Sequence, residues 1–119
     1  MSNIKLGEVE ARFAKLIWDN EPLSSGQLAK LAAVELDWKK TTSYTILKRL
    51  CERGLFQNEG GTVTSRISRE EYYGLHSQQY VEETFGGSLP AFLAAFSSVQ
   101  KLSDQELDEL KKLIDSMKE

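Results

Sequence analysis

The feature that most constrains the fold is a change of hydrophobic period part-way along the chain. Up to Gly54 the apolar residues recur every three or four positions, which is typical of helices that pack on a core by one face. From Leu55 to Ile67 they alternate with polar residues, which is typical of strands buried on one side. Helical spacing returns from Ser68 onward. A chain of 119 residues with this order fits one small domain with an added helical element.

Three short helices are predicted before the change of period. The first covers Glu8 to Trp18. The second begins at Ser24, where the spacing to Gln27 is that of a capping box. The third runs from about Thr41 to Arg53 and is closed by Gly54, a residue at which helices commonly stop.

Two short strands are predicted next, over Leu55 to Asn58 and Thr62 to Ile67, with a Glu-Gly-Gly turn between them. Three helices followed by a hairpin is the order of a winged helix-turn-helix domain. We therefore expect a mainly α fold in which residues 1–67 form such a domain and the hairpin is its wing.

Residues 68–119 are expected to be a helical dimerisation region. Capping boxes begin helices at Ser68 and Ser103, Gly86-Gly87 breaks the chain, and a very apolar helix starts at Ser88. The apolar stripes need a partner surface, and a second chain is a better partner than the domain beyond the hairpin; the alternative is that the tail folds back on that domain. The residues expected at the contact are Tyr72, Phe85, Leu89, Phe92, Leu93, Phe96, Leu107, Leu110 and Ile114.

Composition excludes several classes of protein. One cysteine and one histidine give no disulfide and no metal-ligand cluster, so neither a metal nor another cofactor is expected. Cys51 falls on the apolar side of the third helix and His76 in a polar stretch of the next, which argues against a nucleophile pair and an enzyme. No apolar run is long enough to span a membrane, and the N-terminus lacks a signal peptide, so a cytoplasmic protein without a membrane partner is expected.

The net charge of −3 hides an asymmetry between the two parts. Residues 1–67 hold 10 Lys and Arg against 8 Asp and Glu, whereas residues 68–119 hold 5 against 10. A weakly basic N-terminal part is compatible with binding to nucleic acid, for which phosphate neutralisation supplies much of the affinity. An ordinary acidic tail would give the same count.

The third helix carries the functional prediction. Its apolar side holds Ile46, Leu47 and Leu50, whereas its other side can hydrogen-bond to base edges and phosphates and has no acid between residues 39 and 49. A solvated helix face would usually mix acids with bases. The residues expected to contact double-stranded DNA are Lys39, Lys40, Thr41, Thr42, Tyr44, Thr45, Lys48 and Arg49, with Arg66 from the wing. The alternative function is a winged-helix module for protein contacts without DNA binding, which the overall negative charge favours.

The sequence resembles the penicillinase repressors, a bacterial family that includes beta-lactamase, methicillin-resistance and copper-transport repressors. The resemblance rests on Leu16-Ile17-Trp18-Asp19, on residues 41–50 with Glu52-Arg53-Gly54-Leu55, and on Phe85-Gly86-Gly87-Ser88-Leu89. It implies a homodimeric transcriptional repressor that binds a palindromic operator with its third helix and wing, dimerises through its C-terminal helices, and controls resistance or transport genes.

Two departures limit what the resemblance implies. Family members released by a sensor protease are cleaved at an Asn-Phe pair, where this chain has Ala95-Phe96, which argues against such a protease as a partner. Copper-responsive members carry Cys-x-Cys pairs near the C-terminus, and residues 68–119 contain no cysteine, so copper sensing is not expected.

Overall fold

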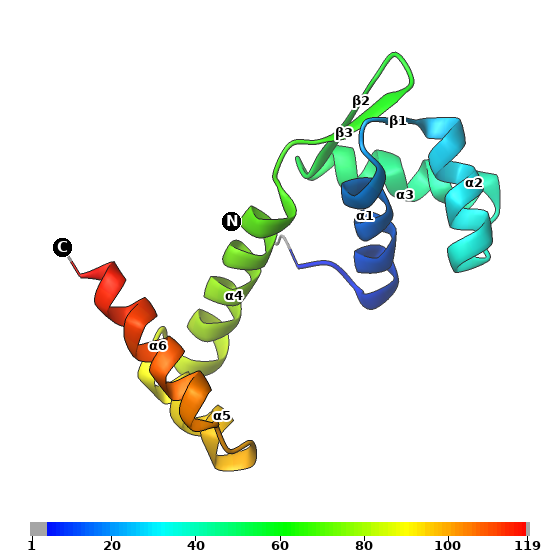
Figure 1. The fold of residues 1–119 in the computed structure, drawn as a ribbon. Helices are drawn as coiled ribbons and strands as arrows, with labels where there is room; N and C mark the ends of the chain where they lie inside the picture. Colours follow the sequence, from blue (N-terminus) through cyan, green and yellow to red (C-terminus); the bar gives the residue numbers. More distant parts are fainter. Residues whose placement is uncertain (1–4, 119) are drawn as a thin grey trace. The chain divides into compact units, whose positions relative to one another are not determined.

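The computed structural model describes residues 5–118, which divide into two compact units, the first ending at Ser77 and the second beginning at Gln78. The elements are α1 (Glu8–Asn20), β1 (Leu23–Ser24), α2 (Ser25–Leu36), α3 (Lys40–Glu52), β2 (Phe56–Glu59), β3 (Thr62–Ser65), α4 (Arg69–Phe85), α5 (Leu89–Val99) and α6 (Asp104–Met117) (Figure 1). The mainly helical fold with three helices, a small antiparallel wing and C-terminal helices is confirmed. None of the helices within residues 5–118 combines the length and the apolar character needed to cross a membrane.

The predicted starts of three helices are also confirmed, because each capping box forms. Ser24 Oγ accepts a hydrogen bond from Gln27 N at 3.0 Å, while Gln27 Oε1 accepts one from Ser24 N at 2.9 Å. The same exchange joins Ser68 to Glu71 and Ser103 to Glu106. These bonds satisfy amides that a helix start leaves without a partner in the helix.

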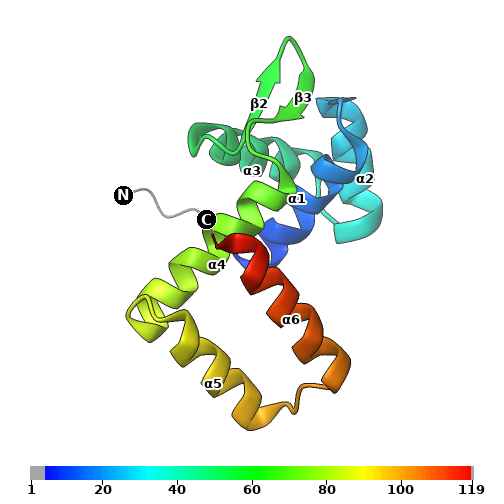
Figure 2. The ribbon, with the colours of Figure 1, turned by 60° about the vertical axis from the view of Figure 1, so that its left-hand side comes forward.

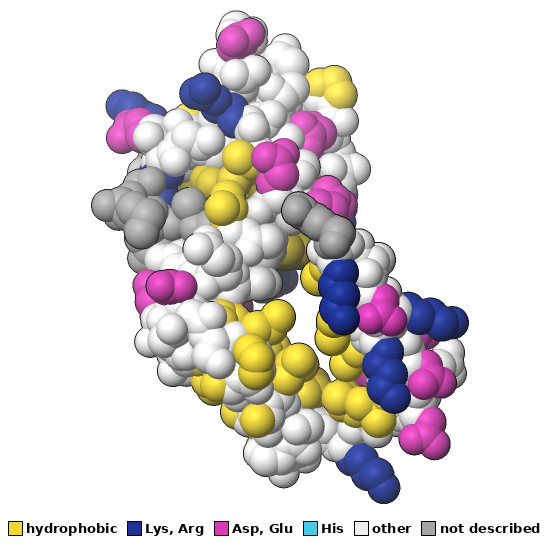
Figure 3. All heavy atoms as spheres, turned by 90° about the vertical axis from the view of Figure 1, so that its left-hand side faces the viewer, with side chains coloured by type: hydrophobic (Ala, Val, Ile, Leu, Met, Phe, Trp, Pro, Cys, Tyr) yellow, Lys and Arg dark blue, Asp and Glu magenta, His cyan; other side chains and the backbone are white. Residues whose placement is uncertain are grey.

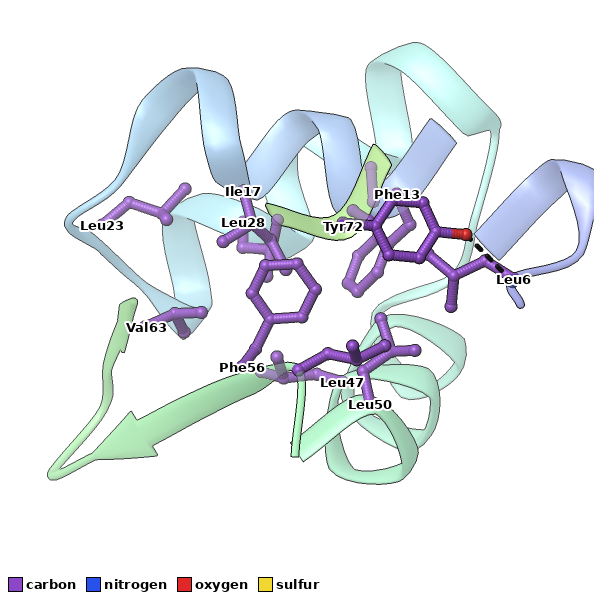
Figure 4. Packing of buried hydrophobic residues seen from close by; sticks show 13 residues of the cluster. Leu6, Phe13, Ile17, Leu23, Leu28, Leu47, Leu50, Phe56, Val63 and Tyr72 are labelled. Atoms are coloured by element: carbon purple, nitrogen blue, oxygen red, sulfur yellow. Dashed lines mark hydrogen bonds between the residues drawn. The ribbon is translucent and has the colours of Figure 1, made fainter. Parts of the chain in front are cut away.

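The core of the N-terminal unit is built from one side of each helix and the inner side of the hairpin. Two tryptophans pack at its edges. The ring centroid of Trp38 lies 5.0 Å from that of Phe13, and the ring centroid of Trp18 lies 5.3 Å from that of Phe56. Full burial of a Val, Leu, Ile or Phe side chain in such a core stabilises the fold by about 1.5–3 kcal/mol. At the centre of the cluster lie Phe13, Ile17, Leu28, Leu47, Leu50, Phe56 and Val63 (Figure 4).

The wing belongs to a three-stranded sheet rather than a hairpin alone. The strand order is β1-β3-β2, all antiparallel, with Leu23 of β1 opposite Val63 of β3. Figure 2 shows the β2–β3 hairpin projecting beyond the helices that carry it. Strand β1 was not predicted, because two residues are too few to show an alternating pattern.

The first turns of α4 belong to the N-terminal unit. Tyr72 is buried there, its ring centroid lies 5.5 Å from that of Trp18, and its hydroxyl accepts a hydrogen bond from Leu6 N at 3.1 Å (Figure 4). His76, which falls in a polar stretch of the sequence, is half-buried and stacks on the same ring. The structure thus places Tyr72 in the core of its own chain, whereas the sequence suggested a dimer contact; the ring is covered because α4 begins directly after the wing and returns to the core.

The C-terminal unit has no core of its own among its described residues. No residue from 78 to 118 is buried. Its aromatic residues touch by their edges, with centroids of Phe85 and Phe92 5.7 Å apart and those of Tyr80 and Phe92 6.2 Å apart. Figure 3 shows hydrophobic side chains gathered on the surface of these helices. An apolar groove of about 390 Å³ runs between α5 and α6, lined by Phe92, Leu93, Phe96, Leu102, Glu106, Glu109, Leu110 and Leu113.

Candidate nucleic-acid interface

Helix α3 presents a polar ridge to solvent. Its inner side is fixed by Ser43, Leu47 and Leu50, which are buried and recur at helical spacing. Ile46 packs beside them against the core, the other side chains of the helix from Lys40 to Arg49 are exposed, and no acid occurs until Glu52 at the last position of the helix. The exposed residues of this ridge, which we call the α3 ridge, are Lys40, Thr41, Thr42, Tyr44, Thr45, Lys48 and Arg49.

The start of α3 is open to an anion. Lys39 is the N-cap residue and is exposed, and within the described part of the chain no side chain makes a capping hydrogen bond at this helix start. Helix N-termini favour phosphate oxygens, because free amides and the helix dipole both point at them. Lys40 Nζ lies 5.8 Å from the centre of the Tyr44 ring, which holds a cation beside the same turn.

One side chain of the ridge, that of Thr45, is oriented by a hydrogen bond to the helix backbone. Thr45 is exposed, and its Oγ1 donates a hydrogen bond to Thr41 O at 2.9 Å, which holds the side chain against the preceding turn. Lys48 and Arg49 follow one turn later and are exposed. Thr can contact a thymine methyl or accept from a base, while Lys and Arg can donate to guanine O6 and N7.

Arg66 stands at the base of the wing, directly after β3, and is exposed. Its backbone N–H donates to Leu55 O at 2.9 Å, which fixes it to the residue that joins the end of α3 to β2. The ridge and Arg66 thus come from consecutive elements of one unit.

The residues considered for catalysis are not arranged as a reactive pair. Cys51 is half-buried on the inner side of α3, and burial, followed by the nearby charge of Glu52, raises the pKa of its thiol above the ordinary value. A raised pKa keeps the thiol protonated and unreactive near neutral pH. His76 stacks on Tyr72 in α4. Within the described part of the chain, no group of acidic, His or Cys side chains could hold a metal ion.

The family model of the penicillinase repressors matches residues 6–116. The chain belongs to the penicillinase repressor family. It is a winged-helix, DNA-binding transcriptional repressor, and not an enzyme.

Similar proteins agree with this membership. The penicillinase repressor of Bacillus licheniformis is 24% identical over 118 residues, which cover 96% of this chain and 92% of that protein. The methicillin resistance regulatory protein MecI of Staphylococcus aureus is 19% identical over 114 residues, which cover 92% of this chain and 93% of that protein. The solution structure of monomeric B. licheniformis BlaI in complex with the blaP half-operator matches with a TM-score of 0.50 and 25% identity, over 60% of this chain and 94% of that one.

Sequence patterns missed three residues of this repressor that line the α5–α6 groove or contact the wing. Leu113 and Leu102 line the α5–α6 groove. Leu113 stands three residues after Leu110 in α6, so helical spacing could have identified it. Glu21, which contacts the wing from the end of α1, carries no local signal, because its partner is 44 positions away.

Proposed function

We propose that this repressor binds a palindromic operator as a homodimer, with the α3 ridge of each protomer in the major groove and Arg66 on the DNA backbone. The proposal rests on one observation above all, the exposed and acid-free α3 ridge held outward by a buried inner face. A recognition helix has this division, since one side must hold it on the domain while the other reaches base edges. A winged-helix domain used only for protein contacts would not require a helix face free of acidic residues.

Charge supports the same function. Lys39, Lys40, Lys48 and Arg49 are all exposed on or beside α3, although the whole chain carries a net charge of −3. The surplus of acidic over basic residues lies in residues 68–119 and therefore outside α3. Local positive charge of this kind supplies the salt-dependent part of DNA affinity.

The C-terminal unit supplies the reason for a dimer. A helical segment without buried residues cannot offset the conformational entropy that folding removes, so a partner must cover its apolar surface. A second copy is the partner we propose, because a palindromic site requires two identical subunits related by twofold symmetry. The proposed contacts are Phe85, Leu89, Phe92, Leu93, Phe96, Leu107, Leu110 and Ile114, together with Leu102 and Leu113.

The names of the similar proteins suggest which genes this repressor controls. The B. licheniformis protein is a penicillinase repressor and the S. aureus protein regulates methicillin resistance, so we propose beta-lactam resistance genes as the targets of this repressor. A sensor protease is not part of the proposal. Ala95 precedes Phe96 in α5, where cleaved family members carry Asn.

A gel-shift titration tests DNA binding. The protein is titrated against the DNA upstream of its own gene and against an unrelated duplex of equal length, at two salt concentrations. We expect a specific complex that weakens steeply with salt, and a loss of about 1–3 kcal/mol when Lys48→Ala or Arg49→Ala removes a base contact.

Lys15→Ala is the matched control, since it removes an exposed Lys from α1 rather than from the ridge. Its affinity should stay within about twofold of the wild type, because a distant surface charge contributes little at physiological salt. Absence of any complex at low salt would instead support a module for protein contacts.

A further inference from the structure

The central strand of the sheet, β3, pairs on one edge with β2 and on the other edge with the segment that precedes α2. Leu23 and Ser24 of β1 pair with Val63 and Thr62 of β3. One residue further on, Ser25 N donates to Gly61 O at 2.9 Å. These contacts reach from the middle of β3 to its turn with β2 and leave the base of the strand, at Ser65, beyond the end of β1.

The amide of Ser65 must find a partner on the β1 side. The next amide, Arg66 N, donates to Leu55 O on the β2 side, and successive amides of a strand point to opposite edges. Counting back from the Leu23–Val63 pair, Glu21 is the residue opposite Ser65. The backbone pairing of β1 has stopped at Leu23, so a main-chain acceptor is not available there.

The carboxylate of Glu21 takes this amide. Glu21 Oε1 accepts from Ser65 N at 2.9 Å, and Ser65 Oγ lies 2.8 Å from Oε1 and 2.9 Å from Oε2. Both oxygens of the half-buried carboxylate are therefore used at one residue of β3. Hydrogen bonds to an ionised acceptor are among the stronger ones in proteins.

Arg66 lies between this contact and a second one from α1. Trp18 Nε1 donates to Ile67 O at 3.1 Å, so the residues before and after Arg66 are both tied to the end of α1. With Arg66 N bonded to Leu55, three consecutive residues have fixed backbones while the Arg66 side chain remains exposed.

We propose that Glu21 is a positioning residue for DNA binding, which sets the base of the wing so that Arg66 meets the DNA backbone. The inference rests on the proposed function, since the wing matters in this sense only if the protein binds DNA. Preorganisation of a contacting side chain lowers the entropy that binding must remove.

Because Glu21 is negatively charged, the direction in which its removal changes the DNA affinity tests the proposal. Glu21 is an acid close to the wing, so if it acted only through its charge, its removal would strengthen binding to a polyanion. If it positions the wing, Glu21→Ala weakens binding although it removes a negative charge, whereas Glu21→Gln, which keeps an acceptor for Ser65 N, does not. The two roles predict opposite signs for the same substitution.

The experiment measures the affinity of the full chain for the DNA upstream of its own gene, with the wild type, Glu21→Ala, Glu21→Gln and the control Glu59→Ala. Glu59 is an exposed acid at the other end of the hairpin, so its removal changes charge without touching Ser65. We expect Glu21→Ala to bind about fivefold more weakly, and the other two variants to bind as tightly as the wild type or more tightly.

Two further measurements separate positioning from loss of structure. In a protein that already carries Arg66→Ala, adding Glu21→Ala should not weaken DNA binding further. In the wild-type background, Glu21→Ala should reduce the salt dependence of the affinity by about the contribution of one phosphate contact. Amide hydrogen exchange without DNA should be faster at Ser65 in Glu21→Ala and unchanged in Glu21→Gln.

Each outcome decides a separate point. If the wild type binds DNA and Glu21→Ala binds as tightly as Glu21→Gln, the positioning role is wrong while the proposed function stands. The role is equally wrong if Glu21→Ala weakens binding by the same factor with and without Arg66. If the wild type does not bind, the proposed function itself fails.

Discussion

Ser43 lies on the inner side of α3 with 2% of its surface exposed, and its hydroxyl has no hydrogen-bond partner among residues 5–118. A buried polar group without a partner costs about 1–3 kcal/mol, so Ser43→Ala should raise the free energy of unfolding by about 1 kcal/mol. Urea denaturation measures this change. DNA affinity should not change, because the side chain faces the core; a clear loss of stability would mean that the hydroxyl bonds to a group within the domain.

Cys51 provides a test by pH. Burial and the charge of Glu52 raise the pKa of its thiol, so thiolate forms only at a higher pH than in the unfolded chain. The stability that the neutral thiol contributes is fully present below the unfolded pKa and is lost as pH rises through the folded pKa. Iodoacetamide labelling should therefore show a higher midpoint for the native protein than for the protein in urea. Because Cys51 is the sole cysteine, mass spectrometry follows this site alone, and a midpoint at or below the unfolded value would contradict the expectation.

At the scale of elements, α6 depends on its cap. Ser103 Oγ accepts from Glu106 N at 3.1 Å, and α6 buries no residue within its own chain. Ser103→Ala should cost about 1 kcal/mol of helix stability in each protomer. Because the helix is expected to fold as part of the dimer and both protomers lose the cap, the dimer dissociation constant should rise about 30-fold. Sedimentation equilibrium measures the constant.

Ser103→Asp is the matched rescue, since Asp also caps helices. Ser98→Ala is the control, because the Ser98 hydroxyl donates to Ala95 O one turn back in α5 and does not cap a helix start. Equal effects of Ser103→Ala and Ser98→Ala would argue that the cap is not coupled to association.

At the scale of the whole molecule, the two units should respond differently to the same change of an apolar residue. Leu110→Asp places a charge in the α5–α6 groove and should give monomers in sedimentation velocity, because a charge at a desolvated interface is costly without a partner. The monomer should retain only the weaker binding of one half-site. Val34→Asp is the control, since Val34 is 80% exposed on α2 in the N-terminal unit. A dimer that persists in Leu110→Asp would contradict the proposed dimer contact.

Much of this fold could be predicted from local patterns. The three capping boxes, the inner stripe of α3 and the switch to alternating residues all depend on positions within about four residues of one another. The exposed ridge follows from the same periodicity, since fixing Leu47 and Leu50 inward leaves Thr45, Lys48 and Arg49 outward.

Contacts between distant positions could not be predicted in this way. Strand β1 exists because β3 offers it an edge, Glu21 acquires its role from Ser65, and Tyr72 is buried because α4 packs against Trp18 and Leu6. None of these pairings leaves a periodic trace, and for Tyr72 the helical pattern alone suggested an intermolecular contact.

By itself, then, the sequence determined which segments are helical, where they begin, and which side of α3 is polar, because backbone geometry turns short-range spacing into a face. Only the tertiary structure decided which of those faces are covered within the chain, how the wing is fixed to α1, and that the C-terminal helices are left with apolar surface exposed. The physical reason is that burial and hydrogen-bond satisfaction are properties of pairs of segments, which meet only once the chain has folded.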